Sequence, residues 1–323
     1  MSNKRILMCG AALIAGVMMI GAARAAQAPS KVDTIITGKA HDALFALAFN
    51  QNNGVAVGAA GAILDTADGG KTWKPVTPSP TQLSLLGVDL NGAHQIAVGQ
   101  MGLILKRDAQ SAWQKIDSGT EERLFAVSLN SQGVAAAVGS FGTVLKSADG
   151  GQSWAAIAPD WSGYTEDGAQ PHLYGVNVDE AGAITIAGEF GLILRSMPGQ
   201  AGWQTLHKGA ASIFALEIRD DGVGYAVGQS GAALRSGDGG NTWSELATGS
   251  EAILLGVRST ADGEVVASGM RDMVSSSDDG KTWSHVTSGD LQSAWYAGLA
   301  RAASGAPLLA VGHTGKIIRI DQQ

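Results

Sequence analysis

A unit of about 40 residues recurs along the chain from Val32 to the C-terminus, and this repetition limits the possible folds more than any single motif does. Each unit opens with a short apolar segment and continues, about ten residues later, with a second segment that ends in glycine. A second glycine usually follows three residues on, and a tryptophan comes late in six of the units. Four short strands joined by tight turns are typical of one blade of a β-propeller.

The repeats define the whole architecture. The opening segments are residues 44–47, 85–88, 124–127, 173–176, 213–216, 254–257 and 295–298, and the tryptophans are Trp73, Trp113, Trp154, Trp203, Trp243 and Trp283. No stretch has the periodicity of a long amphipathic helix. We therefore predict an all-β fold, a single seven-bladed β-propeller over residues 26–323.

The seventh unit stops after its third strand, and the missing fourth strand has a counterpart at the other end of the chain. Residues 32–38 align with residues 283–289, and each segment comes just before a first strand. The N-terminal segment is therefore predicted to complete the last blade and close the ring. Closure removes two free sheet edges that would otherwise favour aggregation.

Four units carry the pattern Ser/Thr-x-Asp-x-Gly-x-Ser/Thr-Trp, known as an Asp-box. Its aspartates are Asp68, Asp149, Asp238 and Asp278. The carboxylate can accept hydrogen bonds from the amides of its own turn, glycine supplies the positive φ, and tryptophan buries a large ring. We interpret these aspartates as turn locks; the alternative makes them catalytic acids or calcium ligands.

The first residues have the features of an export signal. Lys4 and Arg5 precede an apolar stretch over residues 6–22, and residues 23–25 fit a cleavage site between small side chains. We expect cleavage after Ala25, leaving a mature protein in the periplasm or outside the cell; the alternative is that the segment stays on the chain as an uncleaved anchor. Cys9, the only cysteine, would leave with this segment, so disulfides and thiolate metal sites are not expected.

The charge of the mature chain argues against nucleic acid as a partner. Loss of Lys4, Arg5 and Arg24 changes the formal net charge from −7 to −10. A negative surface repels phosphate backbones. We expect a protein partner, membrane contact that is at most indirect, and a monomer in the free state.

The Asp-box blades with a Val-Gly-x-x-Gly-x-Ile/Leu core resemble the family of photosystem II stability/assembly factors and their bacterial relatives. Residues 57–73, 138–154 and 227–243 are clear examples, and the resemblance extends from Val32 to Ile320. It implies a seven-bladed scaffold without catalytic activity, which holds a membrane-protein intermediate during assembly. The arginine-rich patch and the lipoprotein cysteine of photosynthetic members have no counterpart here, so photosystem II itself is not expected to be the partner.

An enzyme is the rival class, because Asp-boxes also occur in sialidases and other glycosidases. Such enzymes need paired acids, and sialidases also need an arginine cluster and a Phe/Tyr-Arg-Ile-Pro motif that this chain lacks. The candidate acids are Asp42, Glu121, Glu122, Glu189 and Asp272. The six histidines show no metal-binding spacing, so no metal or cofactor is expected.

The loops between second and third strands and the loops that enter each first strand should lie together on one face. One of these incoming loops is enlarged, since Trp154 and Trp203 are 49 residues apart where neighbouring tryptophans are 40 or 41 apart. We predict a partner-binding surface on this face. Its candidate residues are Trp161, Tyr164 and His172 of the enlarged loop, and Met101, Phe141, Glu189, Phe190 and Arg271 of the second-to-third loops.

These candidates have an alternative interpretation. Met101, Phe141 and Phe190 could fill gaps between blades, and Trp161 could hold its own loop against the blades. A column of basic residues also repeats at the end of the third strand: Lys106, Lys146, Arg195, Arg235 and Arg319. We favour a packing role for this column over contact with lipid headgroups or an acidic partner.

The sequence therefore predicts a non-catalytic periplasmic scaffold or assembly factor, which binds an envelope or membrane protein complex through one propeller face. A carbohydrate-binding or carbohydrate-cleaving propeller is the alternative.

Overall fold

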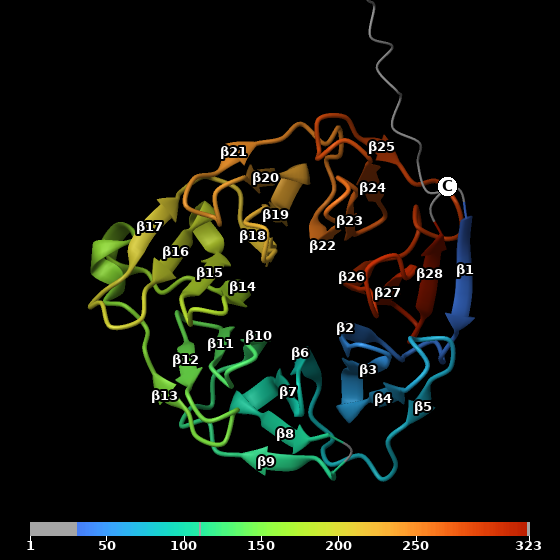
Figure 1. Ribbon diagram of the computed structural model, residues 1–323, viewed down its shortest axis with the longest axis horizontal. Coiled ribbons are helices and arrows are strands. Elements are labelled where there is room, and N and C mark those ends of the chain that lie inside the picture. The colour runs from blue at the N-terminus through green and yellow to red at the C-terminus, as the bar shows by residue number, and fades with distance from the viewer. Residues whose placement is uncertain (1–30, 110, 322–323) are drawn as a thin grey trace, which may run out of the picture.

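The computed structural model describes residues 31–109 and 111–321, and within them 28 strands form seven four-stranded antiparallel sheets around a central axis (Figure 1). Each sheet is one blade, with its first strand at the axis and its fourth at the rim. The predicted all-β, seven-bladed propeller is confirmed. The expected leader over residues 1–25 lies outside the described residues.

The blades follow one pattern. The first strands are β2 (Leu44–Asn50), β6 (Leu85–Asn91), β10 (Leu124–Leu129), β14 (Leu173–Val178), β18 (Ile213–Ile218), β22 (Leu254–Ser259) and β26 (Tyr296–Ala300). The second strands are β3 (Asn53–Gly58), β7 (His94–Gly99), β11 (Ala135–Gly139), β15 (Ile184–Gly188), β19 (Gly224–Gly228), β23 (Val265–Gly269) and β27 (Leu308–Gly312). The third strands are β4 (Ile63–Thr66), β8 (Ile104–Asp108), β12 (Val144–Ser147), β16 (Ile193–Ser196), β20 (Ala233–Ser236), β24 (Met273–Ser276) and β28 (Ile317–Asp321). The outer strands are β5 (Lys74–Pro75), β9 (Gln114–Ile116), β13 (Ala155–Ala156), β17 (Gln204–His207), β21 (Ser244–Glu245), β25 (Ser284–His285) and β1 (Lys31–Ile36).

The N-terminal strand closes the ring as predicted. β1 pairs with β28 in blade 7, so that Val32 lies opposite Ile320. The Arg319 guanidinium adds a bond of 2.6 Å to the Asp33 carboxylate across the same pair of strands. The sheet edge that β28 would otherwise expose is therefore paired.

The predicted register of blade 7 is wrong by one residue. The strand begins at Tyr296, not Trp295, because Tyr296 pairs with Gly312 as Leu44 pairs with Gly58 in blade 1. Two neighbouring aromatic residues made both alignments reasonable. The Trp295 ring instead stacks on Phe45 of blade 1, with centroids 5.7 Å apart and planes 8° apart.

The Asp-box aspartates lock their turns. In the first box the Asp68 carboxylate accepts from the Thr72 amide at 3.0 Å and from the Thr72 hydroxyl at 2.6 Å, while the Trp73 indole donates to the Gly70 carbonyl at 3.0 Å. The other three boxes repeat these bonds. Hydrogen bonds from Thr242 lower the pKa of Asp238 to about 2. This geometry supports the interpretation as turn locks.

The basic column has mostly local partners. Lys106 is 2.8 Å from Asp108 on its own strand, and Arg319 binds Asp33 and Asp321. Arg195 is 8% exposed and donates to the Gly239 carbonyl and the Asn241 side chain of the next blade's Asp-box turn. These bonds join blades and strands, which favours the packing role.

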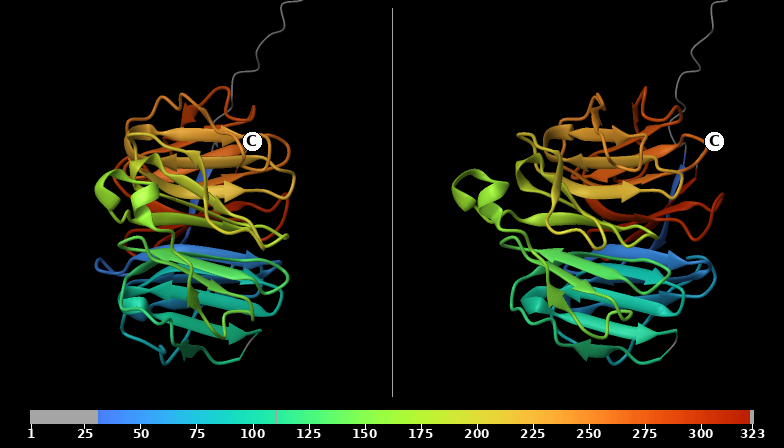
Figure 2. Two further views of the ribbon diagram at one scale, coloured as in Figure 1. Left: turned by 90° about the vertical axis from the view of Figure 1, so that its left-hand side faces the viewer. Right: turned by 60° about the vertical axis from the view of Figure 1, so that its left-hand side comes forward.

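The disc has two distinct faces. One carries the turns between second and third strands, which include η1 (Ala59–Gly61), η2 (Gln100–Gly102), η5 (Glu189–Gly191) and η6 (Gln229–Gly231), together with the loops that enter the first strands. The two sets of loops touch, since the Gly102 amide donates to the Glu122 carbonyl at 2.9 Å. We call this the turn face and the opposite one, with the Asp-boxes, the box face. The enlarged loop, with η3 (Trp161–Gly163) and η4 (Glu166–Gly168), stands out from the turn face (Figure 2).

Candidate partner-binding face

A left-handed residue sits at the tip of the second-to-third turn in every blade of the described ring. In chain order these residues are Ala60, Met101, Phe141, Phe190, Ser230, Arg271 and Thr314, with φ between 49° and 59°. The turn is tight, since the Leu103 amide donates to the Gln100 carbonyl at 3.1 Å across Met101 and Gly102. None of the seven is glycine, although L-residues rarely adopt this conformation.

In six of the seven blades a glycine follows the tip residue, and in blade 6 its place is taken by Asp272. The space next to this glycine is filled, as blades 1 and 2 show. A Cβ on Gly61 would lie 2.0 Å from the Thr81 carbonyl oxygen, and one on Gly102 would lie 1.9 Å from the Thr120 carbonyl oxygen. The incoming loop of the next blade therefore occupies the space beneath this position. In these blades only the preceding residue has room for a side chain, and that side chain points away from the ring.

Large exposed apolar side chains gather on the turn face. Six such residues are exposed in residues 31–109 and 111–321: Met101, Phe141, Phe190, Met197, Ile253 and Met270. All except Met197 belong to second-to-third turns or incoming loops of this face. Met101 and Phe141 are the most exposed, at 65% and 58%. Such a concentration on one face is typical of an interaction surface.

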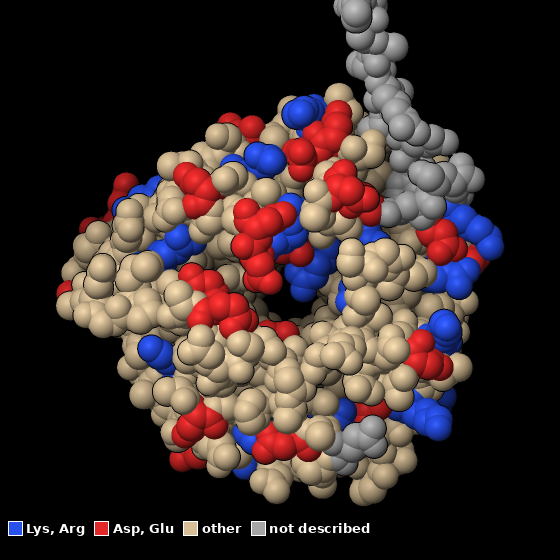
Figure 3. All heavy atoms as spheres, in the orientation of Figure 1, with Lys and Arg blue, Asp and Glu red and all other residues tan. Residues whose placement is uncertain are grey.

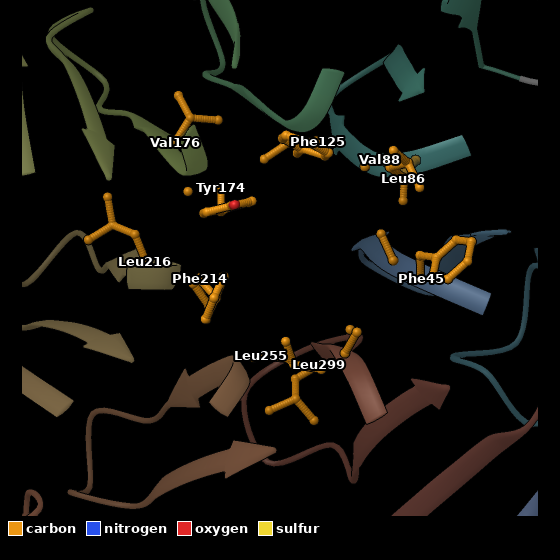
Figure 4. A pocket seen from close by; sticks show the side chains of 18 of the residues that line it. Phe45, Leu86, Val88, Phe125, Tyr174, Val176, Phe214, Leu216, Leu255 and Leu299 are labelled. Atoms are coloured by element: carbon orange, nitrogen blue, oxygen red, sulfur yellow. The ribbon is translucent and has the colours of Figure 1, made fainter. Parts of the chain in front are cut away.

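Five aromatic rings connect Phe141 to the axis of the propeller. His172 lies 5.0 Å from Phe141 and 6.2 Å from Phe125, Phe125 lies 5.3 Å from Tyr174, and Tyr174 lies 4.8 Å from Phe214 (ring centroids). We call Phe141, His172, Phe125, Tyr174 and Phe214 the aromatic chain. Its inner members gather on one side of the central channel, a cavity of about 310 Å³ (Figure 4).

A groove opens beside the outer end of this chain. It has a volume of about 670 Å³, within the usual size of ligand pockets. The apolar side chains of Met101, Phe125 and Phe141 line it together with Glu121, Glu122 and Arg123 of the loop that enters blade 3. A surface that combines exposed rings with a few charged side chains suits a protein partner.

His172 connects the second-to-third turn of blade 3 to that of blade 4. Its Nδ1 accepts a bond of 3.2 Å from the Phe141 amide of blade 3, and its own amide donates to the Glu189 carboxylate of blade 4 at 2.8 Å. His172 thus fixes the backbone of the Phe141 turn. Of the predicted residues, the structure brings together Met101, Phe141, His172 and Glu189.

The sequence predicted Trp161 as an exposed partner-binding residue of the enlarged loop, and this prediction is wrong. The side chain is 5% exposed and packs in the core between blades 3 and 4. A Cβ on Gly142 would lie 2.1 Å from the indole Nε1, so the indole fills the place that incoming backbone takes over the equivalent glycines of blades 1 and 2. Tyr164 is partly buried against this ring, and its hydroxyl donates to the Trp203 carbonyl at 2.7 Å.

The remaining predicted residues are placed separately. Phe190 is exposed on the blade 4 turn next to Glu189, and Arg271 is exposed at the tip of the blade 6 turn. In the part of the chain that the structure describes, no hydrogen bond or cation–π contact joins Arg271 to the aromatic chain. Phe125, Tyr174 and Phe214 were not among the residues predicted from the sequence, although each is an aromatic residue at the second position of a first strand.

A family assignment follows from comparison with known proteins. A model of the family described as photosynthesis system II assembly factor YCF48 matches residues 25–320. The chain belongs to this family. No curated protein sequence matches it.

Solved structures share the fold. A YCF48 bound to a D1 peptide has a TM-score of 0.71 at 18% identity, covering 91% of this chain and 96% of that one. YCF48 from Cyanidioschyzon merolae has a TM-score of 0.71 at 20% identity, covering 90% and 98%. The WD40 repeats of RRP9 reach 0.73 at 13% identity, covering 92% and 100%. At these identities the likeness concerns architecture.

Four of the five candidate catalytic acids of this YCF48-family chain have a hydrogen-bond partner of their own among the described residues, and Glu121 is the exception. Asp42 accepts from the Lys39 amide, Glu122 from the Ser140 hydroxyl, and Asp272 from Ser250 and His285. Glu121 and Glu122 are adjacent in the loop that enters blade 3, whereas Asp42, Glu189 and Asp272 belong to blades 1, 4 and 6. Within residues 31–109 and 111–321, no hydrogen bond joins two of these carboxylates. Among residues 31–109 and 111–321 there is no cluster of three or more metal-ligating side chains. In the same ranges no helix is long and apolar enough to span a bilayer.

Charged side chains near the box-face ends of the first strands bind neighbouring backbone and side chains. Asp89 accepts from the Leu129 amide of the next blade at 2.8 Å, and burial raises its pKa to about 6. Glu217 accepts from the Ser259 hydroxyl and lies 3.6 Å from Arg258, and burial raises its pKa. Figure 3 shows acidic and basic side chains interspersed on this face. Its charges bind one another and neighbouring backbone, in contrast to the apolar turn face.

Proposed function

We propose that this chain is a non-catalytic scaffold that binds an envelope protein or membrane-protein complex through its turn face. The observation that carries the proposal is the gathering of exposed apolar side chains there, with Met101 and Phe141 beside one groove. Burying such side chains against a partner contributes roughly 25 cal/mol per Å² of apolar area. The description of the family as an assembly factor supports the proposal, as does the solved YCF48 that is bound to a D1 peptide.

The proposal includes a location outside the cytoplasm. Its support is the basic, apolar and small-residue pattern over residues 1–25. Mass spectrometry of protein isolated from a periplasmic fraction would test it. A mature chain starting at Ala26 is the expected result, and a full-length chain found only in the cytoplasm would contradict this part of the proposal.

A photoreactive amino acid at position 141 tests the binding face directly. Cross-linking in cells should give an adduct with an envelope protein from position 141. The same amino acid at position 197 is the matched control, because Met197 is also exposed, at 39%, but belongs to a β16–β17 turn on the box face. Equal adduct yields from both positions would show that the turn face is not the binding face.

The absence of catalysis is tested separately. The proposal of a non-catalytic chain is supported by the absence from the sequence of the arginine cluster and the Phe/Tyr-Arg-Ile-Pro motif that sialidases need. We expect no hydrolysis of sialosides or aryl glycosides by the purified protein. Turnover that disappears in Glu189→Gln or Asp42→Asn would instead establish a glycosidase.

A further inference from the structure

The acidic residues of the turn face are concentrated on the same blades as the exposed aromatic rings. In the second-to-third turns and incoming loops of blades 3 and 4, seven Asp and Glu residues face one basic residue, Arg123. The corresponding loops of blades 5, 6, 7 and 1 hold four Asp and Glu residues and four Lys and Arg residues. The negative charge is therefore local to the aromatic side and does not merely reflect the composition of the chain.

Several of these carboxylates lie at the groove itself. Glu121 is exposed at its edge and makes no side-chain hydrogen bond or ion pair within residues 31–109 and 111–321. Glu122 lines the groove and accepts a bond of 2.8 Å from the Ser140 hydroxyl. Glu189 lies on the other side of His172, whose amide it accepts. Within the described residues, no ion pair joins Arg123 to these acids. The groove is thus apolar in its wall and negative at its rim.

From this juxtaposition we infer that the groove binds an extended segment of the protein partner in which apolar side chains alternate with lysine or arginine. The apolar side chains seat against Phe125, Phe141 and Met101, and the basic ones reach Glu121, Glu122 and Glu189. The inference rests on the proposed function and specifies the chemistry of its partner. A second copy of this chain fits less well, since its formal net charge is −7 and its turn face is itself acidic.

Three labelled peptides of equal length provide the test, measured by fluorescence anisotropy with the mature chain. One alternates Lys with Leu and Phe, the second replaces each Lys by Glu, and the third replaces each Leu and Phe by Ser. Only the first is expected to bind, and more weakly as salt is added. Equal binding of the second peptide, equal binding of the third, or no binding of any would overturn the inference.

Substitutions of Glu121 and Arg123, two exposed residues of the same loop, should change peptide binding in opposite directions. Glu121→Gln removes a rim carboxylate and should weaken binding of the Lys-Leu-Phe peptide by about two- to five-fold. Arg123→Gln, in the same loop, removes the one basic residue and should strengthen binding by a similar factor. Both side chains are solvent-exposed, so neither change should alter folding. If both substitutions weakened peptide binding, or both strengthened it, the inferred attraction between the acidic rim and the basic side chains of the peptide would be wrong.

Phe141→Ser tests the apolar wall, with Met197→Ser on the box face as the matched control. Peptide binding should fall about ten-fold or more in Phe141→Ser and stay unchanged in Met197→Ser. Equal loss in both variants would place the peptide elsewhere.

Sedimentation at the same concentrations tests whether a second copy of this chain occupies the groove. A dimer that Phe141→Ser dissociates would make a second copy the occupant and overturn the inference. If no peptide binds but position 141 still cross-links to an envelope protein, the inferred apolar and basic character of the bound segment is wrong, and the proposed function stands.

Discussion

Trp161 and Phe141 lie on the same face of the propeller, a short distance apart, and have opposite environments. Trp161 belongs to a long loop and is 5% exposed, whereas Phe141 belongs to a tight turn and is 58% exposed. A long loop has enough backbone to fold a ring back onto the blades, as Trp161 does over Gly142. A turn with two left-handed residues has no such freedom, so its side chain stays in solvent.

An enlarged loop in the sequence indicates that one blade differs from the others, but its length does not tell whether its side chains bind a partner or pack on the blades. The enlarged loop stabilises the junction of blades 3 and 4 and delivers His172, which fixes the Phe141 turn through its Nδ1. The short turns present the apolar side chains. Under the proposed function, stability and partner binding depend on different but neighbouring aromatic residues, and substitutions can separate the two.

Trp161→Ala should have the largest effect, on stability. Removing a buried indole leaves a cavity in the core between blades 3 and 4, and such substitutions cost about 3–5 kcal/mol. Urea denaturation followed by circular dichroism measures the change. A variant as stable as the wild type would show that the indole is not part of the core, and would erase the contrast with Phe141.

Phe141→Ser should act on binding and leave folding intact. The side chain is exposed and its main ring contact is His172, so the melting temperature should change little. Recovery of the partner cross-linked from position 101 should fall about ten-fold, as expected for the loss of an aromatic anchor. A lowered melting temperature with unchanged cross-linking would assign Phe141 a packing role instead.

The repeats made the fold predictable, because seven copies of one pattern specify seven blades independently. Closure by the N-terminal strand also followed, since the segment at Val32 matches the fourth strands of other blades. The blade 7 register failed where the pattern gave two solutions, at Trp295 and Tyr296. A single residue of slip changes which ring stacks on Phe45.

The site was predictable only in part. The tip residues Met101 and Phe141 were found because they stand between fixed glycines. Phe125 and Tyr174 were missed, since an apolar residue in a first strand suggests core, and only the assembled ring shows that they face the channel. The burial of Trp161 depends on Gly142, a residue of another blade, which no local pattern reveals.

Tyr164→Phe should have a smaller effect than Trp161→Ala and act in the same direction. The change removes the hydroxyl that donates to the Trp203 carbonyl at 2.7 Å and keeps the ring packed on Trp161. A hydrogen bond of this kind contributes about 0.5–1.5 kcal/mol. The denaturation midpoint in urea should fall accordingly, with cross-linking from position 141 unchanged. A loss of cross-linking without loss of stability would return the enlarged loop to the binding surface.

Phe190→Asn should have the smallest effect and the opposite sign. Phe190 has φ of 59° and is 48% exposed, so its backbone conformation is unfavourable and little packing compensates for it. Asparagine adopts left-handed φ more readily, because its short side chain can bond locally. We expect a gain of up to about 1 kcal/mol in the free energy of unfolding, because a left-handed L-residue costs roughly 1–2 kcal/mol. Ser230→Asn at the same turn position of blade 5, with φ of 55°, is the matched control for the backbone effect. A gain in Ser230→Asn combined with a loss in Phe190→Asn would mean that the Phe190 ring packs against the disc in solution. The division between buried loop aromatics and exposed turn aromatics would then not extend beyond Phe141.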